Sequence, residues 1–229
     1  MIDIHTHVLP FVDDGSKSLQ DSIKMVEEAV NVGVTDMIIT PHFRSPYLCL
    51  KEKLIEEFEK FKKGINALGI PINLYLGQEI CAVKKYADVL EENKLLTMNG
   101  TDFILAEFYF HKEMDVVDSV FELTRKGHKV IVAHPERYPY LTIDDIVEIK
   151  TCGGLIQINS GSILGDNGFK VKKLSKELLK RGLVDFVASD MHSGRKYVFA
   201  KAYEYVKKKF TEQYANEIFN ENAKMLIEK

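Results

Sequence analysis

Short apolar segments and amphipathic segments alternate along this chain, and that order restricts its fold more than any other feature. The apolar segments are rich in β-branched residues and predict strands, while the segments between most of them have helical spacing. Such alternation predicts a parallel sheet, either closed into a barrel or open with helices on both faces. The predicted strands are Met1–Ile4, Val34–Thr40, Ile72–Gly77, Asp102–Glu107, Lys129–Ala133, Leu155–Asn159 and Asp185–Ser189.

The helical segments carry recognisable start and stop signals. Ser18 and Asp21 predict a capping box before the first helix, and Gly33 predicts its end. The glycine cluster between Gly161 and Gly168 predicts a loop within the domain. The predicted helices are Leu19–Val32, Lys51–Leu68, Val83–Asn93, Met114–Lys126, Ile143–Lys150, Val171–Arg181, Lys196–Lys209 and Glu212–Glu228.

The residues after the first strand favour the barrel over the open sheet. An open sheet that binds nucleotides has a glycine-rich turn at this point, whereas this chain has His5-Thr6-His7 and an acidic loop. No repeat, low-complexity segment or long Pro/Gly/Ser linker divides the chain. We therefore expect a TIM-like α/β barrel, (β/α)7, in one domain over residues 1–229.

Charge and cysteine content exclude several classes of protein. The 31 basic and 34 acidic residues are interspersed, and no single-sign block indicates a nucleic-acid or anionic-membrane partner. No apolar run approaches the ~18 residues of a membrane span, and the N-terminus lacks signal-peptide features, so we expect a cytoplasmic protein without membrane insertion. Cys49, Cys81 and Cys152 are odd in number and form no C-x-x-C pair, which argues against disulfides and a cysteine-built zinc site.

Metal-capable side chains stand where most of the predicted strands end. In a barrel, the carboxyl ends of parallel strands converge on the face where barrel enzymes keep their active sites. His111 and His128 lie elsewhere and are interpreted as surface or structural residues. The strand-end residues are His5, His7, His42, Glu79, Glu107, His134, Asp190 and His192.

The chemistry of this set points to a metal. His5 and His7 are two apart in a strand and face the same side, although that pair alone is equally consistent with two structural histidines. Glu79 and Glu107 end apolar strands and need a cation or hydrogen-bond donors. Histidines and carboxylates without thiolate suit Mn²⁺, Fe²⁺ or Zn²⁺, and a shared carboxylate would let two ions lie close together. The alternative is a salt-bridge network, which rarely needs so many histidines on one face.

Further candidates lie on neighbouring loops. Asp14, in Asp13-Asp14-Gly15, is able to supply another ligand, although this sequence is also typical of a simple turn. Arg137 and Arg195 each lie three residues after a candidate histidine, where their planar guanidinium groups suit phosphate oxygens. Either arginine is also compatible with a solvated loop position.

Taken together, these segments resemble the polymerase and histidinol phosphatase (PHP) superfamily. Within it, the chain is similar to the capsular polysaccharide tyrosine-protein phosphatases of Gram-positive bacteria. The likeness includes Leu9–Ser16 and the order and spacing of all the motifs, so it covers nearly the whole chain. The motifs are His5-Thr6-His7, Thr40-Pro41-His42, Gly77-Gln78-Glu79, Glu107, His134-Pro135-Glu136-Arg137-Tyr138 and Ser189-Asp190-Met191-His192.

The resemblance implies a distorted seven-unit barrel with three divalent ions, usually Mn²⁺, with Fe or Zn also possible. Arg137 would bind substrate phosphate, with Arg195 as a second contact. The implied substrate is the phosphotyrosine tail of a membrane-associated tyrosine kinase that controls capsule or exopolysaccharide export. The implied ligand sets are His5, His7, Glu79 and Asp190 for one ion, Glu79 as a bridge with Glu107 and His134 for the second, and Asp14, His42 and His192 for the third.

We therefore expect a metal-dependent protein-tyrosine phosphatase in which a metal-bound hydroxide attacks phosphorus. A C-x5-R cysteine mechanism is excluded, because the arginine positions are occupied by Ile55, Ala87 and Ile158. Two alternatives remain open. One is a histidinol-phosphate or other small-molecule phosphoesterase, and the other is a non-catalytic metal-binding regulatory protein on the same scaffold.

Overall fold

The computed structural model describes residues 1–82 and 94–228, so the predicted helix Val83–Asn93 lies outside the described residues. Its strands form two hydrogen-bonded groups, which are parallel throughout except for the last pair of the second group. The first group is β1 (Ile2–Thr6), β2 (Asp36–Ile39) and β5 (Asn73–Leu76). The second, in spatial order, is β10 (Phe186–Ala188), β9 (Leu155–Asn159), β8 (Lys129–Ala133), β7 (Phe103–Glu107), β6 (Glu79–Cys81), β3 (His42–Arg44) and the antiparallel β4 (Tyr47–Leu48).

The two groups join into one ring. β2 continues into β3 and β5 into β6, so each pair is one bent strand shared between the groups. On the other side, the backbone N–H of Asp190 donates to the carbonyl of His5 (2.9 Å), and that of His7 donates to the carbonyl of Met191 (3.0 Å). These bonds connect β1 with the segment after β10. The predicted seven-stranded barrel is therefore confirmed, in a distorted form.

The two bends explain why the structure has more strand segments than the sequence predicts. Pro41 lies between β2 and β3 and has no N–H to donate to a ladder. Gly77 lies between β5 and β6 where the backbone passes close to its neighbours. A Cβ there would lie 2.9 Å from Sδ of Met98 and 3.3 Å from Cγ2 of Ile38. The chain therefore turns at these points and aims His42 and Glu79 at the end of the barrel.

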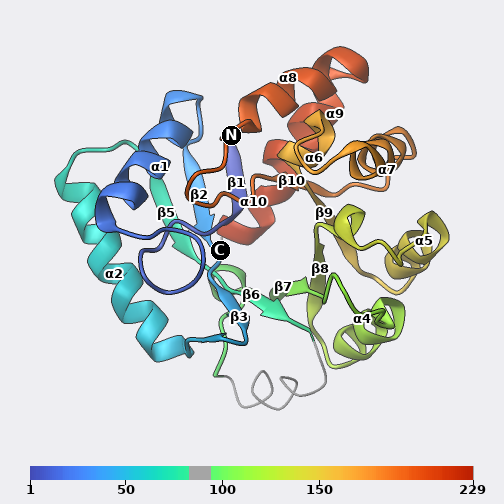
Figure 1. The fold of residues 1–229 in the computed structure, drawn as a ribbon, viewed down its shortest axis with the longest axis horizontal. Coiled ribbons are helices and arrows are strands. Elements are labelled where there is room, and N and C mark those ends of the chain that lie inside the picture. The colour runs from blue at the N-terminus through green and yellow to red at the C-terminus, as the bar shows by residue number, and fades with distance from the viewer. Residues whose placement is uncertain (83–93, 229) are drawn as a thin grey trace.

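Helices surround the ring (Figure 1). Two predictions need correction. The segment predicted as a loop at Gly161–Gly168 begins inside a short helix. The predicted capping box is only half formed: the Ser18 side chain accepts from the Asp21 N–H, but the Asp21 carboxylate accepts from Lys17 N and Ser16 Oγ and not from the Ser18 backbone. The helices are α1 (Leu19–Asn31), α2 (Lys51–Ala67), η1 (Met98–Gly100), α4 (Val116–Arg125), η2 (Pro135–Arg137), α5 (Ile143–Thr151), α6 (Ser160–Leu164), α7 (Phe169–Lys180), α8 (Phe199–Lys209), α9 (Glu212–Asn216), η3 (Glu217–Glu221) and α10 (Asn222–Ile227).

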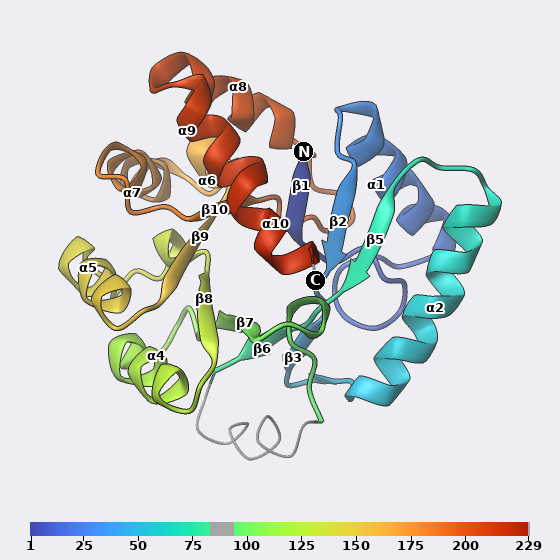
Figure 2. The ribbon, with the colours of Figure 1, turned by 180° about the vertical axis from the view of Figure 1, so that it is seen from behind.

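Apolar side chains fill the barrel at the end opposite the predicted site. Ile4, Ile38, Ile131 and Phe186 pack together with Leu226 of α10. Figure 2, seen from behind, shows α10 lying in front of the strands at this end. With one end of the barrel closed by apolar packing, polar side chains are concentrated at the other. None of the described helices is long and apolar enough to cross a membrane.

Candidate metal centre

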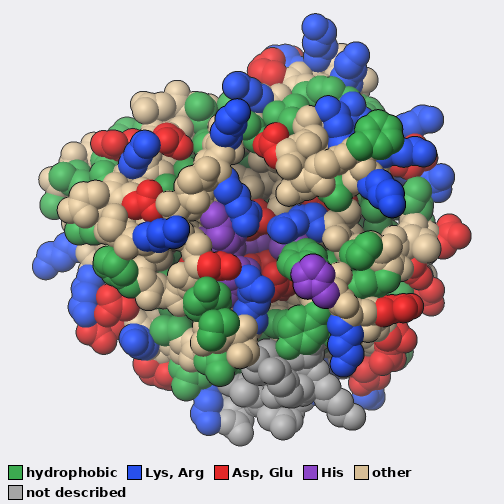
Figure 3. All heavy atoms as spheres, in the orientation of Figure 1, with side chains coloured by type: hydrophobic (Ala, Val, Ile, Leu, Met, Phe, Trp, Pro, Cys, Tyr) green, Lys and Arg blue, Asp and Glu red, His purple; other side chains and the backbone are tan. Residues whose placement is uncertain are grey.

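The predicted site residues converge at the carboxyl ends of the strands. Figure 3 shows a depression on this face, with histidine and acidic side chains at its floor and basic side chains around it. All of the predicted ligands are buried except Asp14, whose side chain is 40% exposed. They come from β1 (His5) and the segment directly after it (His7 and Asp14), from β3 (His42), from β6 (Glu79), from the end of β7 (Glu107), and from the residues after β8 (His134) and β10 (Asp190 and His192).

Glu79 lies at the centre of this cluster. Its Oε2 is 2.7 Å from Nδ1 of His42, 3.3 Å from Nε2 of His5 and 3.4 Å from Nε2 of His7. Its other oxygen, Oε1, is 3.0 Å from Nε2 of His134. One carboxylate therefore contacts four imidazoles from three other strands, which is the geometry expected of a bridging ligand.

The described residues form four triads whose donor atoms lie within 4.8 Å of one another. Only His5-His7-Asp190 falls within a single predicted ligand set. In the other triads, Glu107 groups with His42 and not with His134, His5 joins Glu79 and His134, and His7 joins His42 and His192, while Asp14 belongs to none. Asp14 lies at the outer edge, with Oδ1 3.3 Å from Nε2 of His42 and 3.6 Å from Nε2 of His192. The triads are His5-His7-Asp190, His5-Glu79-His134, His42-Glu79-Glu107 and His7-His42-His192.

Several buried atoms in the cluster have charged neighbours but make no well-aligned hydrogen bond. They include Oε2 of Glu79, Oε2 of Glu107 and Nδ1 of His42. A buried polar atom left without a partner costs about 1–3 kcal/mol, and more where the group is charged. Divalent cations would satisfy these atoms, and imidazole with carboxylate is a donor set that Mn²⁺, Fe²⁺ and Zn²⁺ accept. The residues present therefore fit a metal centre.

Without metal, the carboxylates favour protons on some of the imidazoles, while the pKa values of His134 and His192 are lowered by burial. Burial alone would lower the pKa of His5, but Glu79 and Asp190 outweigh it and raise the pKa to about 9. The pKa of His42 is raised well above its usual value because Glu79, Asp14 and Glu107 outweigh its burial. The pKa of Glu107 is raised to about 7 by burial and by the charge of Glu79. A cation entering this cluster would therefore displace protons.

The backbone is strained at two of the predicted ligands. His134 has φ of 38° and Asp190 has φ of 53°, which place both in the left-handed region. For residues other than glycine, such conformations cost about 1–3 kcal/mol and persist where the surroundings enforce them. Gly15 shows a related constraint, since a Cβ there would collide with the carbonyl of His7. This close approach folds the loop that carries Asp14 back onto His7.

Sequence reasoning missed several residues that hold the candidate ligands in place. Oδ2 of Asp13, not assigned a role, lies 2.7 Å from Nδ1 of His7 and accepts from the backbone N–H of His42 (3.0 Å). Gln157 and Asn159 on β9 contact His5 and Asp190. The alternation of Gln157 and Asn159 with apolar residues in a buried strand was the signal that could have found them.

Three arginines lie beside the cluster. Nη1 of Arg137 donates to Oδ2 of Asp190 (2.8 Å), and its guanidinium lies over the ring of Phe110, 4.6 Å from the centroid. Arg195 is half-exposed and lies 3.4 Å from the same Asp190 oxygen. Arg44, which the sequence analysis did not single out, contacts Oδ2 of Asp14 (3.2 Å) and Oε2 of Glu107 (3.4 Å). Donors suited to phosphate therefore border the metal-capable groups.

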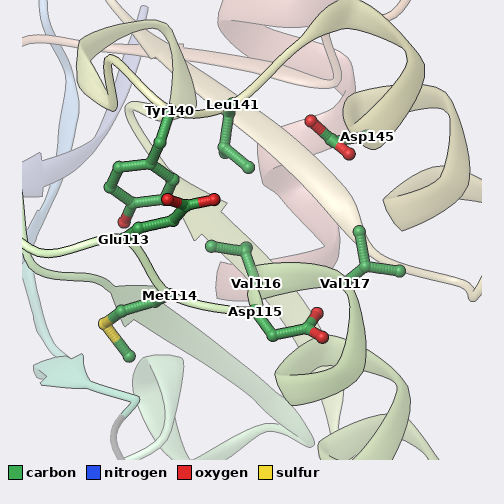
Figure 4. A pocket seen from close by; sticks show the side chains of 8 residues that line it. All are labelled: Glu113, Met114, Asp115, Val116, Val117, Tyr140, Leu141 and Asp145. Carbon is green, nitrogen blue, oxygen red and sulfur yellow. The ribbon is translucent and has the colours of Figure 1, made fainter.

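A separate pocket of about 300 Å³ lies between the segment before α4 and the segment before α5 (Figure 4). None of the metal-capable residues lines it. Asp115 and Asp145 on its wall already cap α4 and α5. Tyr140, also on the wall, donates to the carbonyl of Tyr109 (2.8 Å). This pocket is therefore a gap between the starts of two helices and not part of the metal-capable cluster.

The family model for capsular polysaccharide synthesis, CpsB/CapC, matches residues 1–228. The chain belongs to the CpsB/CapC family. The putative tyrosine-protein phosphatase CapC of Staphylococcus aureus is 34% identical to it over 203 residues, which are 84% of this chain and 77% of that protein. The family model itself extends over the whole barrel and over every segment that carries a candidate ligand.

Solved structures are similar to this chain as well, one in sequence and fold and one in fold alone. The first is from a study of YwqE of Bacillus subtilis and CpsB of Streptococcus pneumoniae, described as unique metal-dependent tyrosine phosphatases. It has a TM-score of 0.92 and 31% identity and covers 100% of this CpsB/CapC chain and 95% of its own. A histidinol phosphate phosphatase of Lactococcus lactis has a TM-score of 0.62 at 14% identity, covering 91% and 92%, and shares the fold.

Proposed function

We propose that this protein is a metal-dependent phosphohydrolase that removes phosphate from phosphotyrosine in a protein substrate. The observation that carries this proposal is the buried cluster around Glu79, in which one carboxylate contacts four imidazoles and oxygens of Glu79 and Glu107 make no well-aligned hydrogen bond. The CpsB/CapC relatives described as tyrosine phosphatases support the same reaction and substrate class.

The metals would be held by the groups that the cluster brings together. His5, His7, Glu79 and Asp190 would hold one ion, Glu79, Glu107 and His134 a second, and Asp14, His42 and His192 a third. We propose Mn²⁺ as the ion, with Fe²⁺ or Zn²⁺ as alternatives of similar donor preference. Divalent cations bound here would activate a water molecule as nucleophile and neutralise charge on the phosphoryl oxygens.

Side chains of the protein would orient the phosphate, and its buried cysteine is not available as a competing nucleophile. Arg137 and Arg195 border the cluster with guanidinium donors that match phosphoryl oxygens, and Arg137 is held in place by Phe110 and Asp190. Burial and the charge of Glu107 raise the pKa of Cys81 to about 12, so this thiol is not a thiolate nucleophile near neutral pH. A phenolate is a good leaving group, so a phosphotyrosine substrate needs little help from a general acid.

We propose that the physiological substrate is the phosphotyrosine tail of a membrane-associated tyrosine kinase of capsule or exopolysaccharide export. The site is at the floor of a depression that opens on one face of the molecule (Figure 3), which suits a side chain presented by a flexible peptide. A cytoplasmic location of this protein is part of the proposal, because the protein would have to meet the kinase tail in the cytoplasm.

Hydrolysis assays test the proposal. After metal removal by a chelator, the protein is expected to lose activity and to regain it with Mn²⁺, with phosphotyrosine peptide turned over faster than phosphoserine peptide or histidinol phosphate. Cys81→Ser serves as a control and is expected to keep full activity. Preference for histidinol phosphate would replace the substrate assignment. Metal-loaded protein inactive between about pH 6 and 9 would contradict the enzyme assignment and favour a regulatory metal-binding protein.

Metal binding is expected to release protons. The pKa of His5 is raised to about 9, so His5 carries a proton at pH 7.5 in the metal-free protein. The pKa values of His7 and His42 are also raised by neighbouring carboxylates, which favours their protonated forms. Each displaced proton lowers the apparent affinity by up to about tenfold per pH unit as the pH falls below its pKa. Calorimetry in two buffers of different ionisation enthalpy measures the release. Equal heats in both buffers would show that no protons leave.

A further inference from the structure

Strand β9 directs two buried amide side chains at the cluster, where most other strands direct histidines or carboxylates. Gln157 and Asn159 are two apart, so both face the barrel interior, and they are 0% and 3% exposed. Burying an amide is costly unless its donors and acceptor are paired. The partners of these amides therefore indicate what they do.

The two amides form a continuous hydrogen-bonded chain between two candidate ligands. Nδ2 of Asn159 donates to Oδ2 of Asp190 (2.8 Å). Nε2 of Gln157 donates to Oδ1 of Asn159 (2.9 Å), and Oε1 of Gln157 lies 2.9 Å from Nδ1 of His5. The backbone N–H of Asn159 donates to Oε1 of the buried Glu136 (2.9 Å), which fixes the end of the strand.

The donor and acceptor of every hydrogen bond in this series are set by the carboxylate of Asp190. An ionised carboxylate only accepts hydrogen bonds, so Asn159 must present its NH₂ group to Asp190. Asn159 then offers its oxygen to Gln157, and Gln157 must turn its own oxygen towards His5. Nδ1 of His5 is consequently obliged to donate. Its proton is placed by three hydrogen bonds that begin at Asp190.

The remaining atoms of both candidate ligands point into the cluster. Nε2 of His5 lies 3.0 Å from Nε2 of His7 and 3.3 Å from Oε2 of Glu79. Oδ2 of Asp190 is occupied by Asn159 and by Arg137, both at 2.8 Å, while Oδ1 faces His5 and His7 at 3.7 and 3.5 Å. The chain of amides thus engages the outward atom of each ligand and leaves the inward atom for the ion.

We propose that Gln157 and Asn159 are positioning residues that hold His5 in the tautomer protonated at Nδ1 and present its Nε2 lone pair, with Oδ1 of Asp190, to the metal. Metal-binding histidines generally donate their second N–H to a neighbouring acceptor, and loss of that acceptor typically costs about 10–100-fold in metal affinity. This inference rests on the function proposed above, because it assigns a role towards the ion of His5 and Asp190.

Gln157→Leu tests the inference, because it removes the acceptor and preserves most of the side-chain volume. We expect Mn²⁺ to bind about 10–100-fold more weakly to this variant in a competition titration with a chelating dye. In Zn²⁺-loaded protein labelled with ¹⁵N-histidine, NMR is expected to show a protected Nδ1–H on His5 of the wild type. That signal should be lost in Gln157→Leu, with His5 assigned from its absence in His5→Gln.

Two further variants separate positioning from a general loss of packing. Gln78→Leu is the matched control, since Gln78 is equally buried but bonds the Cys49 carbonyl and the Leu96 N–H. It is expected to lower thermal stability and leave metal affinity and the His5 tautomer unchanged. Gln157→Glu retains an oxygen towards His5 and is expected to restore the Nδ1–H signal. Because it loses the NH₂ group that donates to Oδ1 of Asn159, it is expected to bind metal more tightly than Gln157→Leu but less tightly than the wild type.

The outcomes distinguish this inference from the proposed function. A wild-type protein that binds no divalent ion overturns the proposed function, and this inference with it. A wild-type protein that binds metal while Gln157→Leu binds it equally tightly overturns the inference alone. So does an Nε2–H tautomer of His5 in the Zn²⁺-loaded wild type, or an equal loss of metal affinity in Gln78→Leu.

Discussion

Glu79→Ala is expected to abolish hydrolysis of phosphotyrosine peptides, with kcat/KM falling by at least ~10³-fold. Glu79 is the one described carboxylate that contacts four imidazoles of the cluster, at 2.7 to 3.4 Å. Its removal would take a ligand from each ion it bridges, and metal catalysis supplies several kcal/mol of transition-state stabilisation. Metal content per chain, measured by elemental analysis, is expected to fall together with activity.

The comparison needs a variant that changes a charged or polar group outside the cluster. His128→Ala serves this purpose, because His128 directly precedes β8 at the opposite end of that strand from His134. It is expected to retain wild-type activity and metal content. Circular dichroism of both variants checks that the barrel is folded. A folded Glu79→Ala protein with full activity would contradict both the role of Glu79 as a metal ligand and the proposed metal mechanism.

Most of the fold could be predicted because local signals and tertiary structure agree. Lys129–Ala133 and Leu155–Asn159 were predicted with the bounds that the structure shows, since the first is a mostly buried apolar run, the second alternates apolar residues with Gln157 and Asn159, and both have clear ends. The breaks near Pro41 and Gly77 were not predicted. The break at Gly77 depends on a close approach to Met98 and Ile38, which are distant from it in sequence, and no local pattern reports such an approach.

The candidate site likewise contains residues that the sequence predicts and residues that it does not. Histidines and carboxylates at strand ends, such as His134 and Asp190, are visible in the sequence because their chemistry is unusual after an apolar run. Asp13 and Gln157 are different. They act on His7 and His5 through hydrogen bonds that depend on the folded loop and on the position of β9. An aspartate in a turn sequence and a glutamine in a strand are both common in structural roles. Only their hydrogen-bond partners in the folded protein show that Asp13 and Gln157 contact candidate ligands.

Arg137→Ala is expected to lower kcat/KM for phosphotyrosine peptides by about 10²–10³-fold while metal binding is retained. One nitrogen of Arg137 is engaged by Asp190, and the side chain, 23% exposed, packs over Phe110 beside the metal-capable groups. It would therefore present its other donors to a phosphoryl group without needing to reorganise. Preorganised donors of this kind typically supply about 2.7–4 kcal/mol to a transition state that gains negative charge.

Arg137→Lys distinguishes guanidinium geometry from charge alone. A lysine keeps the positive charge but lacks the planar fork, so we expect partial activity and weaker inhibition by inorganic phosphate than in the wild type. Arg125→Ala is the matched control, because Arg125 is an exposed arginine on α4 paired with Glu122. If Arg137→Ala loses metal and activity together, its contact with Asp190 is what matters. If it retains metal and loses phosphate inhibition, Arg137 binds the substrate phosphate, which is the result we expect.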